Sequence, residues 1–379
     1  MPTLRVGVIG VGQRARRHLS TIIKIKDKYR LTAICDIDKN RAEEAARTYH
    51  AKPYTSIERM LNKENLDVCL IAVQAEGHHV IAEVLAERGI HIITETPIAI
   101  TKVCADYMAK MAERYGVLLE VSENVPRWPH ERLKQMIVAK GVIGDVKRFY
   151  LSYTSGSYHG IAAIRSIIKE EAESVTGRFP SEKLIFERAE IRLKSGIKGI
   201  YENNKLRGNY WEIIGSEGAL MGRSLHLWSK KVKLEIRMDT IKTDDGSSLI
   251  VARVQNRPDL TIQDPFKEYK LKNFDEIAVA DAWISLFEGI VHGRSLTYGA
   301  DNAIKDVETL MAIRESEMKG GVRVHLPLTK MTTHEKLIHE EFAKVYGADP
   351  LNISLDQLRV KYALPNRLKD LLYYGRVLS

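Results

Sequence analysis

The chain has 379 residues, 44% of them hydrophobic and 28% charged, which are values typical of globular proteins. This length fits two domains better than one, and the composition excludes a largely disordered or fibrous chain. Lysine and arginine outnumber aspartate and glutamate by 58 − 49 = 9. Because the two signs are interleaved along the sequence, we expect a small, anionic substrate rather than nucleic acid as the partner of this basic chain.

The sequence also argues against a membrane, a disulfide framework and a metal site. No apolar run reaches the roughly 18 residues of a transmembrane helix, and the N-terminus does not resemble a secretory signal, so we expect a cytoplasmic protein. The three cysteines form no CxxC pair. His334, Glu335 and His339 resemble a zinc-protease motif, but these histidines are five residues apart rather than four, so no metal is predicted.

The first part of the chain alternates between short apolar runs and helical patterns. Thr101 is placed to cap the last of these helices, and Gly116 is placed to end it. Strand–helix–strand repetition of this kind predicts a doubly wound parallel sheet, an α/β Rossmann domain, over residues 1–123. The expected strands are 4–9, 31–35, 68–73, 91–94 and 117–121, and the expected helices include 40–49, 78–87 and 103–115.

A different pattern begins after about residue 145. Residues 188–194 and 231–238 alternate between polar and apolar side chains, which predicts an antiparallel sheet with one polar face. With helices at 276–291 and 302–319, residues 124–328 are expected to form an α+β domain with a large antiparallel sheet for substrate binding and oligomerisation. Residues 329–379 read as a C-terminal helical extension, whose predicted packing points are Phe342, Val345, Leu355, Leu358, Leu368 and Leu371.

A glycine turn follows the first predicted strand. Gly10 permits the tight turn, Gly12 lets a pyrophosphate approach the backbone, and the small Ala15 allows the helix to pack closely on the strand. Gln13 and Arg14 occupy the start of that helix, whose free N–H groups favour phosphate. Asp36 ends the next strand, 36 − 15 = 21 residues on, where a carboxylate binds a ribose 2′-hydroxyl and repels a 2′-phosphate. We predict NAD rather than NADP as cofactor, against the alternative of a turn that merely connects two elements.

At this point the sequence resembles the Gfo/Idh/MocA oxidoreductases, which include glucose–fructose oxidoreductase and inositol dehydrogenases. The similarity runs over residues 4–330, and the segment beyond Leu328 looks like an added tail. The stretches that carry it are Asp67-Val-Cys-Leu-Ile-Ala, His78, Gly89-Ile-His-Ile-Ile-Thr-Glu-Thr-Pro, Gly141-Val-Ile-Gly-Asp-Val, Glu212-Ile-Ile-Gly-Ser-Glu-Gly, Tyr298-Gly-Ala-Asp-Asn-Ala and Gly321-Val-Arg-Val-His-Leu-Pro-Leu.

The resemblance implies a two-domain dehydrogenase whose nicotinamide lies between the Rossmann domain and a large antiparallel sheet. It further implies a homodimer or homotetramer. Val73 and His78, after the fourth strand, and Glu95 and Pro97, after the next, are implied cofactor-binding residues. Glu95 and Pro97 would shape the turn beneath the nicotinamide, and Pro97 could follow a cis peptide bond.

The resemblance fails at part of the chemistry. Family members typically use the lysine of a Glu-Lys-Pro motif, then an aspartate and a histidine four residues apart; this chain has Thr96, Ser155 and His159 at those positions. An imidazole, with an ordinary pKa of about 6.5, can take a hydroxyl proton near neutral pH without help. We therefore predict His159 as the catalytic base, with the phenol of Tyr158 as a second candidate.

Substrate residues are expected just past the last Rossmann strand. Asn124, Arg127 and Trp128 follow that strand at the carboxyl edge, where open parallel sheets bind ligands.

Three functions remain open from sequence. The first is a nicotinamide-dependent oxidoreductase acting on a secondary hydroxyl of a sugar, cyclitol or derivative. The second is a redox-neutral glycosidase that holds NAD tightly and oxidises a sugar carbon transiently. The third is a non-catalytic, NAD-binding regulatory protein, because two proton-handling groups are replaced. Fold alone does not decide among them.

Overall fold

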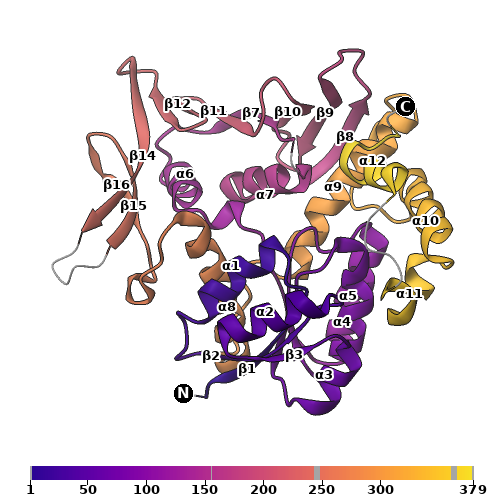
Figure 1. Cartoon of the computed structure of the whole chain (residues 1–379). Coiled ribbons are helices and arrows are strands. Elements are labelled where there is room, and N and C mark those ends of the chain that lie inside the picture. The colour runs from indigo at the N-terminus through magenta and orange to yellow at the C-terminus, as the bar shows by residue number, and fades with distance from the viewer. Residues whose placement is uncertain (1, 155, 243–247, 360–364, 378–379) are drawn as a thin grey trace. The chain divides into compact units, whose positions relative to one another are not determined.

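The computed structural model describes residues 2–154, 156–242, 248–359 and 365–377. Its chain forms two compact units (Figure 1), each assembled from separate stretches. Unit 1 comprises residues 1–123, 268–304 and 342–363, and unit 2 comprises residues 124–267, 305–341 and 364–379.

Unit 1 contains a parallel sheet that is six-stranded over the described residues, in the order β3-β2-β1-β4-β5-β6. This is the Rossmann order, and it matches the predicted fold class. Its strands are β1 Leu4–Ile9, β2 Tyr29–Cys35, β3 Lys52–Tyr54, β4 Val68–Ile71, β5 His91–Thr94 and β6 Leu119–Val121. Its helices are α1 Gln13–Ile22, α2 Lys39–Tyr49, α3 Ile57–Lys63, α4 His78–Ala86, α5 Lys102–Arg114, α8 Phe274–His292 and α11 Leu355–Arg359, with the short turns η1 Ala75–Gly77 and η4 Pro350–Asn352.

Side-chain caps explain where several of these helices begin. The Thr101 hydroxyl accepts a hydrogen bond from the backbone N–H of Cys104 at the start of α5, as predicted. Asp38, Ser56 and Asn273 cap α2, α3 and α8 in the same way. Helix α1 differs, because its N-cap is Gly12 and no side chain caps it. Its first N–H groups are therefore available to a ligand.

The core of unit 1 lies between its sheet and helix α8. Val8 and Leu70 of the sheet are fully buried, in one cluster with Trp283 and Phe287 of α8. The hydroxyl of Tyr29, the first residue of β2, donates a hydrogen bond to the backbone carbonyl oxygen of Trp283 at 2.8 Å. This hydrogen bond links β2 to α8. Helix α8 is thus an integral part of the Rossmann unit.

Unit 2 contains a large mixed sheet that is eleven-stranded over its described residues, in the order β16-β15-β14-β13-β12-β11-β7-β10-β9-β8-β17. All its pairs are antiparallel except β7 with β10, so the predicted antiparallel sheet is corrected at that one pair. Helices α6 and α7 cover one face of this sheet (Figure 1).

The elements wholly within unit 2 are η2 Val125–Arg127, α6 Pro129–Ala139, β7 Val146–Ser152, α7 Ser157–Ile168, β8 Ala172–Arg178, β9 Ile185–Leu193, β10 Lys198–Asn204, β11 Tyr210–Gly215, β12 Gly218–Met221, β13 Ser224–Leu227, β14 Val232–Lys242, β15 Ser248–Val254, β16 Arg257–Gln263, β17 Val324–His325 and α12 Asn366–Tyr374. Three elements pass from one unit to the other, namely η3 Lys267–Tyr269, α9 Ala300–Met318 and α10 Thr333–Tyr346.

Two expected domain assignments change. Residues 268–304, assigned from sequence to the second domain, belong to unit 1, because the apolar side chains of α8 pack on the Rossmann sheet. The extension at 329–379 forms no unit of its own: residues 342–363 join unit 1, and the parts on either side join unit 2. None of the helices in the described part of the chain is long and apolar enough to cross a membrane.

Candidate functional site

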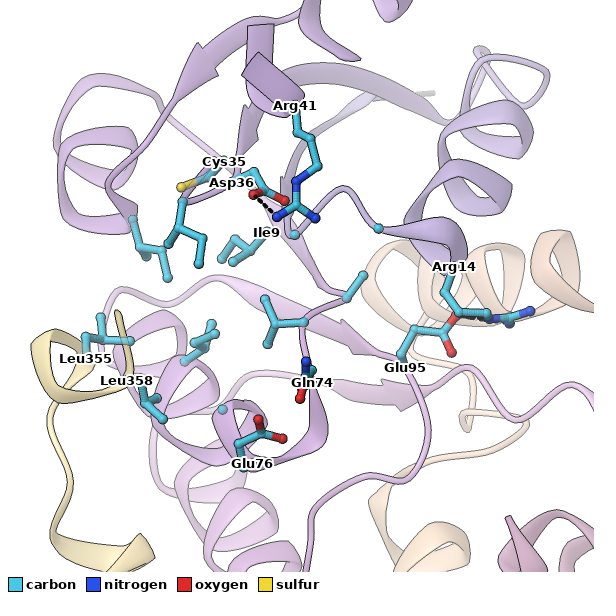
Figure 2. A pocket seen from close by; sticks show the side chains of 18 of the residues that line it. Ile9, Arg14, Cys35, Asp36, Arg41, Gln74, Glu76, Glu95, Leu355 and Leu358 are labelled. Atoms are coloured by element: carbon cyan, nitrogen blue, oxygen red, sulfur yellow. Dashed lines mark hydrogen bonds and ion pairs between the residues drawn. The ribbon is translucent and has the colours of Figure 1, made fainter. Parts of the chain in front are cut away.

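A cavity of about 440 Å³ lies in unit 1, at the carboxyl ends of β1, β2 and β4. Figure 2 shows Arg14 and Glu95 at one end of it, Asp36 and Arg41 along one side, and Leu355 and Leu358 at the other end. The size is within the range of small-molecule sites. The complete lining is Ile9, Gly10, Gly12, Gln13, Arg14, Cys35, Asp36, Ile37, Arg41, Thr55, Ile57, Ala72, Val73, Gln74, Glu76, Gly77, Ile81, Glu95, Thr96, Tyr346, Leu355 and Leu358.

The glycine turn has the geometry that a phosphate group requires. Gly10 has φ +86°, and a Cβ atom there would lie 2.7 Å from the carbonyl oxygen of Ala72, so only glycine fits. A Cβ on Gly12 would meet nothing within 4 Å, which leaves open space beside the backbone. That space adjoins the uncapped N-terminus of α1, where N–H groups and the helix dipole attract an anion. These residues fit a dinucleotide pyrophosphate.

Asp36 is held in place by the backbone around it. Its Oδ2 accepts a hydrogen bond from the N–H of Val11 at 2.9 Å, and its Oδ1 accepts one from the N–H of Asp38 at 2.9 Å. The side chain is only 7% exposed, yet it lines the cavity. The guanidinium of Arg41 lies 3.7 Å from Oδ1. The carboxylate fits a ribose diol, and Arg41 adds a positive charge beside it that the sequence analysis did not identify.

Glu95 lies at the opposite end of the cavity in a charged cluster. Its Oε1 lies 3.0 Å from Nη2 of Arg14 and 2.7 Å from Nε2 of His18. Burial opposes ionisation of Glu95, but the hydrogen bonds from His18 and Arg14, with the charge of Arg14, exceed that effect and lower its pKa to about 2. Arg14 also lies 3.6 Å from Asp275. Two carboxylates therefore hold Arg14, a predicted cofactor residue that does line the cavity.

Three predicted cofactor residues, Ala15, His78 and Pro97, do not line the cavity. Ala15, in the first turn of α1, is fully buried, and its small size permits the close packing of this helix. His78 begins α4 and lies behind the cavity wall, with Nε2 3.1 Å from the carbonyl oxygen of Val73 and Nδ1 3.1 Å from that of Pro97. It joins the loops after β4 and β5 and supports Val73, which does line the cavity. The Thr96–Pro97 peptide is cis, as anticipated.

The predicted catalytic residues lie in unit 2, at the start of α7. The rings of Tyr158 and His159 are 4.4 Å apart, and the ring of Tyr153 lies 5.8 Å from His159. Tyr153 in turn stacks on Trp211, with ring centroids 6.1 Å apart. The helix begins after Gly156, which has φ +94° and lacks a Cβ atom that would lie 3.0 Å from the Tyr158 ring. Ser155, at the position of the family aspartate, lies outside the described residues.

The predicted substrate residues lie on and beside turn η2, which packs against α7 within unit 2. Asn124 and Arg127 are both buried, with exposed fractions of 6% and 3%. Trp128 is half-buried and stacks on His130 at 5.5 Å. Within unit 2 the structure thus brings η2 and the aromatic residues of α7 together.

A buried ion pair in α6 was missed by the sequence analysis. Nζ of Lys134 lies 2.7 Å from Oε1 of Glu131, and the indole N–H of Trp211 donates to Oε2 of Glu131 at 3.1 Å. Lys134 also lies 4.7 Å from the centroid of the Trp211 ring. Burial, then the charge of Lys134, lowers the pKa of the adjacent His130 to about 3. A Glu–Lys pair three residues apart on a helix resembles a solvated surface pair, so spacing alone gave no signal.

The comparisons with known proteins agree with the geometry of the cavity. Residues 4–123 match the oxidoreductase family with an NAD-binding Rossmann fold, GFO_IDH_MocA. The matched stretch contains the glycine turn, Asp36 and Glu95, so the resemblance inferred from sequence is confirmed over these residues, and the NAD-binding fold of the matched family agrees with the predicted cofactor.

Each of the curated relatives is similar to only part of this chain. It is similar to a glycosyl hydrolase family 109 protein of Shewanella pealeana, with 31% identity over 38% of this chain and 34% of the relative. It is also similar to D-apiose dehydrogenase of Paraburkholderia graminis, with 35% identity over 32% of each chain. The chain thus spans about a third of the length of the curated relatives it matches.

Solved structures extend the likeness in fold to both units. An NAD-binding oxidoreductase from Klebsiella pneumoniae superposes with a TM-score of 0.68 at 19% identity, covering 86% of this chain and 99% of that one. Levoglucosan dehydrogenase, in complex with NADH and levoglucosan, superposes with a TM-score of 0.67 at 21% identity, covering 86% of this chain and all of that one (100%). At these identities the likeness concerns the fold.

Proposed function

We propose that this protein is an NAD-dependent oxidoreductase that transfers hydride between nicotinamide and a secondary hydroxyl group of a sugar, cyclitol or sugar derivative. The observation that carries the proposal is a single cavity lined by both the Gly10–Gly12 turn and Asp36. Bound NAD would supply the hydride acceptor. The names of relatives and neighbours, D-apiose dehydrogenase and levoglucosan dehydrogenase among them, support the carbohydrate class.

In this proposal, different residues of the chain bind the cofactor, accept the substrate proton and bind the substrate. The N–H groups at the start of α1 bind the pyrophosphate, and Asp36 accepts hydrogen bonds from the adenosine ribose. His159 accepts the substrate hydroxyl proton, and Tyr158, 4.4 Å from it ring to ring, is the second acid–base candidate. Asn124, Arg127 and Trp128 bind the substrate.

A second function is favoured by a specific observation. The first curated relative is a glycosyl hydrolase family 109 protein, and an α-N-acetylgalactosaminidase of Shewanella oneidensis is 30% identical over 38% of this chain. In a redox-neutral glycosidase the same cavity would hold NAD permanently. Thr96 lines the cavity at the position of the family lysine.

One assay separates these functions. Purified protein is incubated with NAD or NADP and a panel of sugars, inositols and sugar acids, while absorbance follows the reduced cofactor. Net reduction supports the dehydrogenase. Release of nitrophenol from nitrophenyl N-acetylgalactosaminide without net reduction supports the glycosidase. Tight NAD binding without either reaction would contradict both and leave a regulatory protein. The homo-oligomer implied by the resemblance stays a prediction, tested by light scattering.

A further inference from the structure

The C-terminal extension returns to the Rossmann unit and forms one end of its cavity. Tyr346, Leu355 and Leu358 line the same cavity as the glycine turn and Asp36. In Figure 2 the short helix α11 presents Leu355 and Leu358 at the end remote from Arg14 and Glu95. From sequence, both leucines are predicted packing points of a tail outside the family resemblance. Their contribution to a ligand cavity has therefore no counterpart in that resemblance.

This segment is fixed to unit 1 by several contacts. The Tyr346 hydroxyl donates to Oε1 of Glu76 at 3.4 Å, and His79 Nε2 donates to the carbonyl oxygen of Pro350 at 2.5 Å. A Cβ on Gly77 would lie 3.7 Å from Cδ1 of Leu358, so α11 packs directly on turn η1. At the start of α11, Ser354 and Gln357 form a reciprocal cap, with the backbone N–H of each bonded to the side chain of the other.

Glu76 supplies a polar group in the same part of the cavity. It is 6% exposed and lines the cavity, and its Oε2 has no hydrogen-bond partner among the described residues. Burial raises the pKa of this carboxyl group. Figure 2 shows Glu76 on the same side of the cavity as Leu355 and Leu358. A buried oxygen without a partner is costly, which points to a ligand donor that satisfies it.

The position of Asp36 identifies which part of a dinucleotide would reach this region. A carboxylate at the end of the second Rossmann strand binds the adenosine ribose, so the base attached to that ribose lies beyond it. The lining of the cavity includes the apolar side chains of Ile37, Ile57 and Ile81. Adenine has flat faces that suit apolar walls and an exocyclic amine at N6 that donates hydrogen bonds.

We infer that the C-terminal extension completes an adenine subsite in which Leu355 and Leu358 contact the base and Glu76 Oε2 accepts a hydrogen bond from its N6 amine. The inference rests on the proposed dinucleotide binding and deepens it. It gives the added tail a role in cofactor selection. Tyr346 holds the other oxygen of Glu76 and so acts as a positioning residue.

Cofactor analogues test the role of Glu76. Binding of NADH is compared with binding of reduced nicotinamide hypoxanthine dinucleotide, in which an oxo group replaces the N6 amine. The wild-type protein should prefer NADH by about tenfold, because the analogue leaves Glu76 without its donor. Glu76→Gln, whose amide can donate to the oxo group, should reduce that preference to about threefold or less. The exposed Glu87→Gln is the matched control and should keep it.

A second pair of variants tests the leucines. Leu358→Asp should weaken binding of both NADH and ADP-ribose by about tenfold, because a charge replaces an apolar contact to the adenosine half. Leu351→Asp is the matched control, since Leu351 is also half-buried in the extension but does not line the cavity. Leu358→Ala, with an expected weakening of about threefold, replaces Leu358→Asp if the latter fails to fold.

The outcomes separate this inference from the proposed function. If the wild-type protein binds neither NADH nor ADP-ribose, both fail. If it binds NADH but Leu358→Asp and Glu76→Gln bind the ligands as the wild type does, the adenine subsite alone is refuted. A parallel loss in Leu351→Asp would likewise refute it, because the effect would then come from the fold of the extension.

Discussion

The indole N–H of Trp283 donates a hydrogen bond to Nδ1 of His18 at 2.9 Å. Because an indole nitrogen only donates, Nδ1 of His18 must accept, and the ring proton lies on Nε2. That nitrogen then donates to Oε1 of Glu95, 2.7 Å away. A residue of α8 thus fixes the tautomer of a histidine in α1, and this histidine orients a carboxylate at the cavity.

The first prediction concerns the pH dependence of this cluster. The pKa of Glu95 falls from its ordinary value of 4.5 to about 2, because the hydrogen bonds from His18 and Arg14, with the charge of Arg14, exceed the effect of burial. A depressed carboxyl pKa stabilises the fold above pH 4.5, and this contribution is lost as the pH falls toward 2. Glu95→Gln should therefore lower the melting temperature at neutral pH, with a difference that narrows below about pH 4.5. The exposed Glu87→Gln should change little at any pH; a pH-independent deficit in Glu95→Gln would contradict the account.

The second prediction concerns cofactor choice. Asp36→Ser should weaken NADH binding by about tenfold and strengthen NADPH binding, because it removes the ribose acceptor and the charge that repels a 2′-phosphate. Arg41, 3.7 Å from Asp36, should then pair with the phosphate, so Asp36→Ser with Arg41→Ala should lose the NADPH gain. Fluorescence titration of both reduced cofactors measures this. The exposed Glu87→Gln, which does not line the cavity, is the control.

The third prediction tests the proposed proton transfer. His159→Ala should lower kcat by about a hundredfold or more while leaving the Kd for NADH unchanged, because the cofactor cavity contains no part of α7. Tyr158→Phe keeps the ring that packs beside His159 and removes only the hydroxyl. It should lower kcat if the phenol moves a proton and leave it unchanged if the ring merely packs. Full activity in His159→Ala would remove His159 from the mechanism.

The fourth prediction concerns Glu317, a buried group in α9 of unit 2. Burial and the neighbouring charge of Glu187 raise its pKa from 4.5 to about 10. The folded state then holds a proton that the unfolded state releases, so this group destabilises the fold increasingly as the pH rises from 4.5 toward 10. Glu317→Gln should raise the melting temperature, and the gain should be larger at about pH 8.5 than at about pH 5.5.

Glu268→Gln, at an exposed site, is the control for that measurement. An equal gain for Glu317→Gln at both pH values would mean that the carboxyl group does not titrate as described.

Much of unit 1 could be predicted from the sequence, because its strands and helix caps are marked by residues that are close together in the chain. The apolar runs correspond to β1, β2, β4, β5 and β6, and Thr101 caps α5 as expected. Gly10 and Asp36 meet in one cavity because β1 and β2 are neighbours in the sheet. These relationships follow from the βαβ connection and need no distant contact.

Contacts between segments that are distant in the sequence could not be predicted from local sequence patterns. Helix α8 is apolar around most of its surface, which shows that it is buried but not in which unit. Leu355 and Leu358 belong to a five-residue helix, too short for a periodic signal that would distinguish packing from ligand contact. The parallel pairing of β7 with β10 likewise depends on the order of a sheet assembled across the whole unit.

Unit 1 draws its cavity lining from both residues 9–96 and residues 346–358, with most of unit 2 encoded between them. During synthesis the glycine turn therefore leaves the ribosome long before the leucines that close the far end of the cavity. Domains generally fold as they emerge, but the complete cavity can form only after translation has passed residue 358. Full-affinity cofactor loading is accordingly a late event in the maturation of this chain, and ribosome-stalled nascent chains ending before residue 340 should bind the coenzyme more weakly than the released protein.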